Sequence, residues 1–332
     1  MSAELARRAA IGLALIALFT LPLWIGNSYY IKIATEVLYW AVFALALNVL
    51  VGYAGLVSLG HAGLFAFAGY TVGLMLEAGH GHLVADLAAV GLTLMASAIY
   101  AVLALRSTGL GFLMITLALG QIVWGIAYRW AGLTHGDNGV NLRGLPAPFG
   151  ISLTSPEAFY YLALVVLLIA VASMAVFVRS PFGASVRGTR DQARRMSALG
   201  YNVWLVRFLA FLLSGFWTAI AGLLYVYHKQ FISPSVAGLQ SSAEVLLMVI
   251  SGGTATLLGP IAGATIVVVM KNVASAYVER WNLVLGVIFV AIITFMPEGL
   301  VPGLVRLARK SWQAMRGGRP TPGPPVIEGG NS

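Results

Sequence analysis

The sequence predicts an all-α, polytopic integral membrane protein with about ten transmembrane helices and one short helix on the cytoplasmic side. Hydrophobic residues make up 59% of the 332 positions and charged residues only 9%, whereas soluble domains carry about 25% charged residues. Several apolar runs are long enough to cross a hydrocarbon core about 30 Å thick. These runs do not alternate as the strands of a membrane β-barrel would. Helices, which satisfy their own backbone hydrogen bonds in lipid, are therefore the expected form.

Ten apolar runs define the expected spans. Glycine and proline interrupt several of them, and the eighth run either spans the membrane or is re-entrant. The runs cover 9–25, 33–52, 58–77, 83–105, 108–130, 158–178, 203–227, 241–258, 259–277 and 282–302. We therefore expect a transmembrane domain over residues 1–302. The remainder, 303–332, is basic and rich in Pro and Gly, and is expected to be a disordered cytoplasmic tail.

The distribution of lysine and arginine predicts the orientation. With the N-terminus inside, 14 of the 20 basic residues lie at inner ends of spans and 6 at outer ends. The positive-inside rule then places both termini and the segment 179–202 in the cytoplasm, and the loop 131–157 outside. These basic loops also account for the net charge of +9, so no nucleic-acid partner is needed to explain it.

Catalytic and cofactor chemistry find little support in the residue types present. The chain has no cysteine, which excludes disulfides, iron–sulfur clusters and thiolate ligands. None of its four lysines lies in a G-x-x-x-x-G-K-[ST] phosphate loop. His80 and His82, with Asp86, come nearest to a metal site but offer too few ligands. We expect no enzyme activity, metal or cofactor, so any ATP-driven work must enter from another polypeptide.

Polar side chains inside the expected spans are candidates for a solute pathway, because polar groups are costly against lipid. Interhelical hydrogen bonding is the alternative role for each of them. Glu244 stands out, because a carboxylate in a span needs a partner, water or a proton; its place near the outer end of its run also allows simple solvation. The pathway candidates are Asn48, Ser58, His61, Gln121 and Glu244, with Ser214 and Ser242 as further polar positions.

Residues 179–202 form the one substantial polar segment between spans, and they predict a short amphipathic helix over about 180–200. Ser180 can cap the N-terminus, Pro181 suits the first position, and Gly200 suits the left-handed conformation that ends a helix. Its apolar positions at near-helical spacing are Phe182, Val186, Ala193, Met196 and Leu199. The helix either rests on anionic lipid or docks on a cytoplasmic partner. A proline at Ala193 is expected to break it.

Six stretches, in this order, resemble LivM-type permeases of branched-chain amino acid ABC importers. They are ALALNVLVGYAGLVSLGHAGLFAFAGY (44–70), ITLALGQIVW (115–124), THGDNGV (134–140), RSPFGASVRGTRDQARRMSALGYNVWLVRFLAFLLSG (179–215), SSAEVLLMVISGGTATLLGPIAGA (241–264) and FMPEGL (295–300). The resemblance covers about residues 30–302. It implies a multi-pass protein of the bacterial plasma (inner) membrane that forms the translocation pathway of an importer.

The same resemblance implies partners and a role for the amphipathic helix. The partners are a second homologous permease of the LivH type, two cytoplasmic ATP-binding subunits, a periplasmic or extracellular solute-binding protein and membrane lipid. The helix becomes the coupling helix that sits in a groove of the ATPase, with the family's acidic position at Asp191 and its closing Leu-Gly at Leu199 and Gly200. The expected coupling residues are Arg187, Arg190, Asp191, Ala193, Arg194, Leu199 and Gly200.

Two other classes of protein remain as alternatives. A self-contained membrane channel or secondary carrier for a small polar solute is disfavoured by the expected docking helix and the missing phosphate loop. A membrane-embedded enzyme or redox subunit is disfavoured by the absence of cysteine and the small number of histidines. The solute stays open among branched-chain amino acids, urea, amides and organic acids, because a separate binding protein does most of the selecting in such importers.

Overall fold

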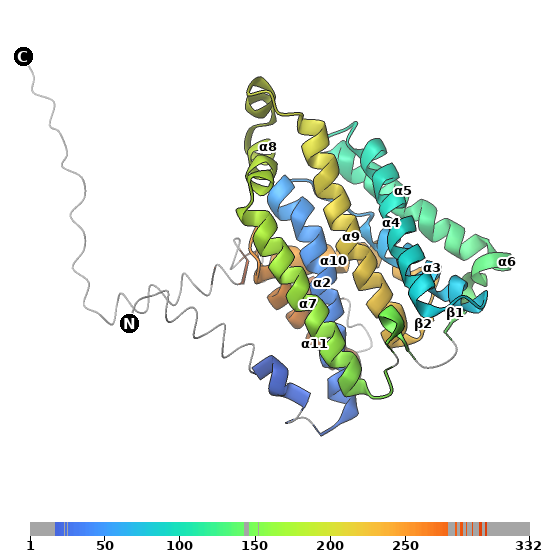
Figure 1. Ribbon diagram of the computed structural model, residues 1–332. Helices are drawn as coiled ribbons and strands as arrows, with labels where there is room; N and C mark the ends of the chain where they lie inside the picture. The colour runs from blue at the N-terminus through green and yellow to red at the C-terminus, as the bar shows by residue number, and fades with distance from the viewer. Residues whose placement is uncertain are drawn as a thin grey trace, which may run out of the picture.

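The computed structural model describes residues 17–22, 24, 26–142, 146–151 and 153–277, and the isolated positions 283, 286, 287, 290, 294, 299, 300 and 303. Within this part of the chain the protein is a bundle of helices (Figure 1). Most of the expected spans 9–25 and 282–302, and the expected tail beyond residue 303, lie outside the described residues.

Five of the described helices are long and apolar enough to cross a membrane. They are α2 (Ser28–Asn48) with the π-helical turn that continues it (Val49–Ala54), α4 (His82–Ala104), α5 (Leu110–Arg129), α7 (Pro156–Arg179) and α9 (Val203–Lys229). Three further apolar helices are α3 (His61–Glu77), α10 (Leu239–Gly252) and α11 (Gly259–Tyr277). The helical membrane fold is confirmed, and the number of ten spans is not.

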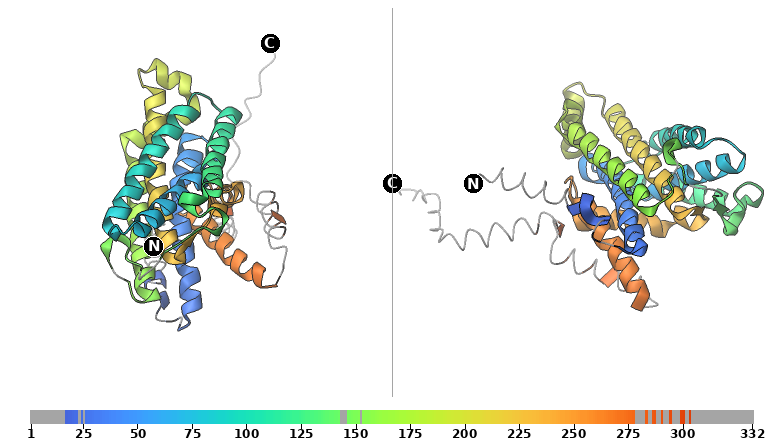
Figure 2. Two further views of the ribbon diagram at one scale, coloured as in Figure 1. Left: turned by 90° about the vertical axis from the view of Figure 1, so that its right-hand side faces the viewer. Right: turned by 60° about the horizontal axis from the view of Figure 1, so that its bottom comes forward.

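Helix α2 forms the centre of the bundle. It packs against α7, α9, α10 and α11, and 89% of its most apolar stretch is buried within the protein. The corresponding fractions for α4 and α5 are 33% and 22%, and these helices lie at the side of the bundle (Figures 1 and 2). Hydropathy does not separate them, since it is 1.9 for the α2 span, 2.1 for α4 and 1.9 for α5, because a helix that faces lipid can be as apolar as one that faces other helices.

Two expected spans are shorter as helices than predicted, and each shortened end lies near a glycine with positive φ. The expected span 58–77 begins as a helix only at His61, after an irregular segment that starts at Gly55 with φ +69°. The expected span 241–258 ends as a helix at Gly252. Its last part, 253–258, is non-helical, with positive φ at Gly253 and Ala255. At 1.5 Å per residue the 14 residues of α10 extend about 21 Å, less than the hydrocarbon thickness of about 30 Å.

Short elements close the end of the bundle that lies away from α8 (Pro181–Ala198). Strand β1 (Val140–Asn141) pairs antiparallel with β2 (Phe231–Ile232), which ties the segment after α5 to the C-terminal end of α9 (Figure 1). The remaining turns are α6 (Ala131–Thr134) and the 3₁₀ turns Gly136–Asn138, Pro148–Gly150 and Pro234–Ala237. Figure 1 shows α8 and these strands at opposite ends of the bundle.

Helix α8 is present where the sequence predicts a helix, with the expected caps. The Ser180 hydroxyl oxygen accepts a hydrogen bond from the Gly183 N–H at 3.1 Å, and Gly200 has φ +87°. Two details differ from the expectation. Leu199, expected on the apolar face, is 67% exposed, because the helix has already ended at Ala198. Gln192 is extended (φ −151°, ψ 87°) and divides α8 into two segments.

The break at Gln192 changes what a proline would do at the next position. Proline favours an extended residue before it and suits the first position of a helix. Ala193 follows the extended Gln192 and begins the second segment of α8. A proline at Ala193 would therefore fit the observed backbone and is not expected to break the helix. A proline that breaks α8 has to replace a residue inside one of the two segments.

Candidate functional site

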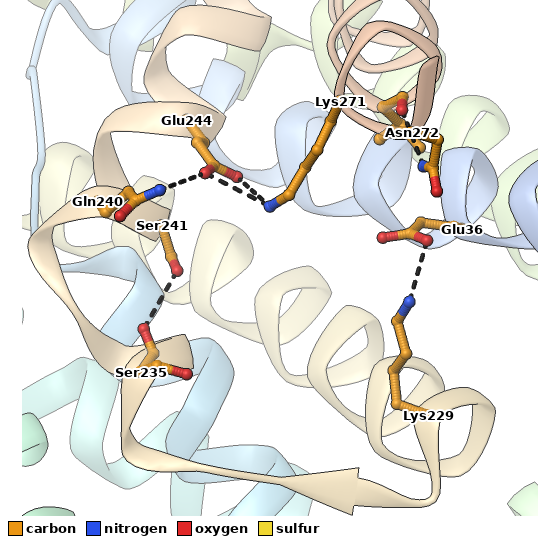
Figure 3. A network of polar contacts seen from close by, with 9 residues as sticks. Glu36, Lys229, Ser235, Gln240, Ser241, Glu244, Lys271 and Asn272 are labelled. Atoms are coloured by element: carbon orange, nitrogen blue, oxygen red, sulfur yellow. Dashed lines mark hydrogen bonds and ion pairs between the residues drawn. The ribbon is translucent and has the colours of Figure 1, made fainter. Parts of the chain in front are cut away.

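A charged cavity of about 330 Å³ lies near the end of the bundle opposite α8. Helices α2, α9, α10 and α11 and the turn Pro234–Ala237 contribute to its wall. Its lining residues are Glu36, Trp40, Tyr225, Lys229, Ser235, Val236, Gln240, Ser241, Glu244 and Lys271. Figure 3 shows the polar side chains of this wall turned toward one another.

Two ion pairs line this cavity, and each joins two different helices. The Lys229 ammonium lies 3.0 Å from a carboxylate oxygen of Glu36. The Lys271 ammonium lies 3.1 and 3.4 Å from the two carboxylate oxygens of Glu244. The Gln240 amide, one helical turn before Glu244, donates a hydrogen bond to it at 3.2 Å. The four charges sum to zero (Figure 3).

The carboxylates lie deeper than the ammonium groups. Side-chain exposure is 13% for Glu36 and 6% for Glu244, against 39% for Lys229 and 36% for Lys271. The long lysine side chains bury their methylene groups while keeping the charge near water. The cavity therefore has a negative floor and a positive rim.

A second polar cluster is closed to solvent. His61 at the start of α3 lies between Ser58 and Ser214, with distances of 2.7 Å from Nδ1 to the Ser58 oxygen and 3.1 Å from Nε2 to the Ser214 oxygen. The Ser214 hydroxyl donates to the Ala46 carbonyl at 2.7 Å, so Ser214 has no second proton to give to the ring. Nε2–H must then donate to Ser214, and Ser58 donates to Nδ1. Each of the three side chains is no more than 1% exposed.

Asn48 forms a third polar contact in the interior, at the end of α2. Its amide nitrogen donates to the Thr256 carbonyl at 2.8 Å, and its amide oxygen accepts from the Ala255 N–H at 3.1 Å. Asn48 thus binds the irregular segment 253–258 with both ends of its amide. A Cβ added to Gly52 would collide with the backbone nitrogen of Ala255, so the two backbones touch here.

Arginines join α8 to the bundle. Arg190 Nη1 donates to the Gly52 carbonyl of the π-helical turn at 2.7 Å, and its Nε pairs with Asp191 at 2.9 Å. Arg187 donates to the Val178 carbonyl of α7 at 2.7 Å. Arg207 of α9 donates to the Thr189 carbonyl of α8 at 3.1 Å. The exposed residues among the expected coupling residues are Arg190, Asp191, Arg194, Leu199 and Gly200, and the half-buried ones are Arg187 and Ala193.

The two histidines considered as metal ligands, His80 and His82, have different surroundings. His82 Nδ1 is 3.1 Å from the Tyr227 hydroxyl, which donates to Asp86 at 2.9 Å. Asp86 also accepts the Phe149 N–H at 2.6 Å, so this carboxylate anchors the Pro148–Gly150 turn, while His80 is exposed. Within the described part of the chain, no group of three or more metal-binding side chains comes together.

Known proteins place the chain in a family. The family described as the permease component of branched-chain amino acid transport systems matches residues 29–293. The chain belongs to this family. The LivM permeases of the high-affinity branched-chain amino acid transport systems of Salmonella typhimurium and Escherichia coli are each 28% identical to the permease, over 82% of its length and 70% of theirs. The LivH permease of Salmonella typhimurium is 25% identical over 49% of this chain and 53% of its own.

A solved structure agrees with the fold. A metal-chelate type ABC transporter in an inward-facing conformation superposes with a TM-score of 0.50, covering 87% of the permease and 98% of that chain at 17% identity. The resemblance to LivM-type permeases that the sequence motifs predict is therefore confirmed. The protein is the translocation subunit of an ABC transporter and a multi-pass protein of the inner membrane.

The permease separates the residues that the sequence groups as one pathway. Glu244 lies in the charged cavity, ion-paired rather than simply solvated. Asn48, Ser58 and His61 lie in the closed interior, and Gln121 is half-buried on α5. The sequence analysis did not identify three charged residues of the cavity. Two of them lie inside expected spans, where a charged side chain is as costly against lipid as Glu244 is. The three residues are Glu36, Lys271 and, at the end of α9, Lys229.

Proposed function

We propose that this permease imports branched-chain or related amino acids, as the translocation subunit of an importer whose ATP hydrolysis is performed by separate subunits. The family match over residues 29–293 carries the proposal. It is supported by the LivM relatives, which are named for high-affinity branched-chain amino acid transport. The translocation pathway is then formed by ten spans within residues 1–302, with both termini in the cytoplasm.

The assembly has further members. The match to LivH supports a second homologous permease beside this one. Two cytoplasmic ATP-binding subunits supply the work, because no phosphate-binding loop occurs in the sequence. A solute-binding protein delivers the amino acid from outside. The basic tail 303–332 extends into the cytoplasm, and the permease itself carries out no chemical reaction.

Uptake by the reconstituted assembly tests this function. The permease, its partner permease, the two ATPases and the binding protein are placed in proteoliposomes, and uptake of radiolabelled leucine, urea, an amide and a dicarboxylate is measured with and without internal ATP. ATP-dependent leucine uptake supports the proposal. Uptake by the permease alone, without ATP, would favour a self-contained channel or carrier.

We propose that α8 couples ATP hydrolysis in the ATPase to movement of the long helices. Its first segment is bonded to the turn after α2, to α7 and to α9 through Arg190, Arg187 and Arg207. A displacement of this segment must therefore act on three long helices. Its second segment, after Gln192, projects Arg194 and Arg195 into solvent, where a partner groove can reach them.

Charge reversal on the exposed second segment tests the coupling role. Replacing Arg194 and Arg195 together by Glu should weaken ATPase association at least about tenfold, or about 1.4 kcal/mol, and remove solute-stimulated ATP hydrolysis. Both side chains are exposed and form no hydrogen bond or ion pair with the other residues that the structure describes, so folding should be preserved. ATPase copurification and hydrolysis with and without loaded binding protein measure the effect.

The matched control reverses a charge elsewhere on the same side. Arg106 lies in the exposed turn between α4 and α5, and Arg106→Glu should leave ATPase association unchanged. A helix that rests only on lipid predicts equal behaviour of the two variants, with full coupling in both. That result would remove α8 from the coupling route.

A further inference from the structure

The charged cavity opposite α8 is complementary in charge to the head group of an amino acid. An α-amino acid carries one ammonium and one carboxylate on the same carbon. The cavity presents carboxylates from α2 and α10 and ammonium groups from α9 and α11 around a volume of about 330 Å³. We infer that this cavity is a subsite that binds the zwitterionic head group of an α-amino acid on its way through the permease. The inference rests on the proposed function.

The depth of the charges sets the orientation of the ligand. Glu244, 6% exposed, forms the floor, and Lys271, 36% exposed, stands at the rim. The ligand ammonium therefore enters first and meets Glu244, while its carboxylate stays beside Lys271. Insertion in this order exchanges one ion pair within the protein for two ion pairs with the ligand, and no charge is left unpaired.

The same cavity offers a place for an apolar side chain. The rings of Trp40 and Tyr225 and the side chain of Val236 line it beside the charges. Trp40 stacks on Phe65, with ring centroids 5.5 Å apart, which holds its ring in place at this wall. Apolar walls with a few converging polar groups are the usual composition of a small-molecule site.

Stability does not explain why four charges surround this opening. An ion pair with a buried carboxylate gives little net folding stability, because removing the charge from water costs about as much as the pairing returns, and ionisable side chains within membrane helices are costly and are usually functional. The hydrogen bond from Gln240 to Glu244 at 3.2 Å fixes the position of the carboxylate. A fixed carboxylate at the floor of an open cavity suits recognition of an ammonium group.

Direct binding to the assembled transporter tests the inference. The complete complex in lipid nanodiscs, without the solute-binding protein, is titrated with L-leucine and followed by saturation-transfer NMR. Two analogues each lack one charge: isopentylamine has no carboxylate and 4-methylpentanoate has no ammonium. Leucine should bind saturably, and each analogue at least tenfold more weakly.

Two variants assign the charges to the ligand. Glu244→Gln should weaken leucine binding at least tenfold but should not weaken 4-methylpentanoate, which has no ammonium to place. Lys271→Gln should show the opposite selectivity and spare isopentylamine. Lys271→Arg keeps the positive charge and should retain most of the binding, which separates a lost charge from a misfolded complex. Glu77→Gln neutralises a carboxylate outside this cavity and should change nothing.

The outcomes of this experiment separate the subsite from the proposed function. Equal leucine binding by the native, Glu244→Gln and Lys271→Gln complexes would overturn the subsite, and so would equal binding of leucine and its two analogues. ATP-dependent leucine uptake by the native proteoliposomes would in either case leave the proposed function standing. Failure of that uptake, with charge-dependent leucine binding intact, would instead count against the proposed function alone.

Discussion

The two polar regions of this permease solve the problem of polarity in a membrane in different ways. The interior cluster of Ser58, His61 and Ser214 is neutral, no more than 1% exposed, and hydrogen-bonded from helix to helix. The charged cavity keeps its four charges around an open volume, with both lysines more than one-third exposed. Both regions contain residues that are costly in lipid, so cost alone does not identify a solute pathway. The charged cavity differs from the interior cluster in its open volume and in having carboxylates that lie deeper than the ammonium groups.

Asn48→Leu should give the largest loss of stability, because it disrupts a place in the interior where two backbones are in contact. The variant removes both hydrogen bonds to the segment 253–258 and adds bulk beside Gly52. We expect a loss of about 3 kcal/mol, from unpaired buried backbone groups and overpacking. Reversible unfolding in mixed SDS micelles measures it.

A polar side chain bonded only within its own helix provides the control for Asn48. The Thr71 hydroxyl donates to the Phe67 carbonyl four residues earlier, and Thr71→Ala should cost less than about 1 kcal/mol. If Asn48→Leu proves as mild as Thr71→Ala, the amide bridge contributes little to the packing of the interior.

His61→Leu should give an intermediate loss of about 2 kcal/mol. The ring is the link between Ser58 and Ser214, and its removal leaves one hydroxyl on each side without its partner. The structure predicts a loss of stability here, with normal uptake per folded complex. Unfolding of His61→Leu, Ser214→Ala and the double variant forms a cycle that should show coupling of at least about 0.5 kcal/mol. Additive losses would mean that the hydrogen bond is energetically unimportant.

Glu244→Gln should have the smallest effect on stability, less than about 1 kcal/mol, because its partner Lys271 can return to water at the cavity rim. The same unfolding assay measures it. The two regions have different roles if His61→Leu lowers stability and preserves uptake, whereas Glu244→Gln preserves stability and lowers uptake. A loss above about 2 kcal/mol for Glu244→Gln would make the cavity part of the structural interior.

Local physical rules were enough to predict much of this fold. Apolar runs of spanning length, each with no more than one charged residue, predicted α4, α5, α7 and α9 to within a few residues. The caps of α8 follow from the hydrogen-bonding ability of Ser180 and the backbone freedom of Gly200. These are properties of neighbouring residues, and a sequence displays them directly.

The candidate site depends on contacts that no local rule contains. The partners of Glu244 and Glu36 lie 27 and 193 positions away along the chain, so their pairing appears only when the helices are assembled. Arg190 is an expected coupling residue, and only the assembled structure shows that its guanidinium donates a hydrogen bond to the Gly52 carbonyl. Glycine content alone could not separate tight packing from broken helices, and both occur, at Gly52 and at Gly253.

The contact between Gly52 and Ala255 limits where moving parts of the transport cycle can divide. Helices slide past one another when a layer of side chains can exchange positions. No such layer separates Gly52 from Ala255, because their backbones are in direct contact. Asn48, at the end of α2, also forms two hydrogen bonds to the segment 253–258. The end of α2 and the segment before α11 must therefore travel together as one piece. The plane of shear in this permease has to run elsewhere in the bundle.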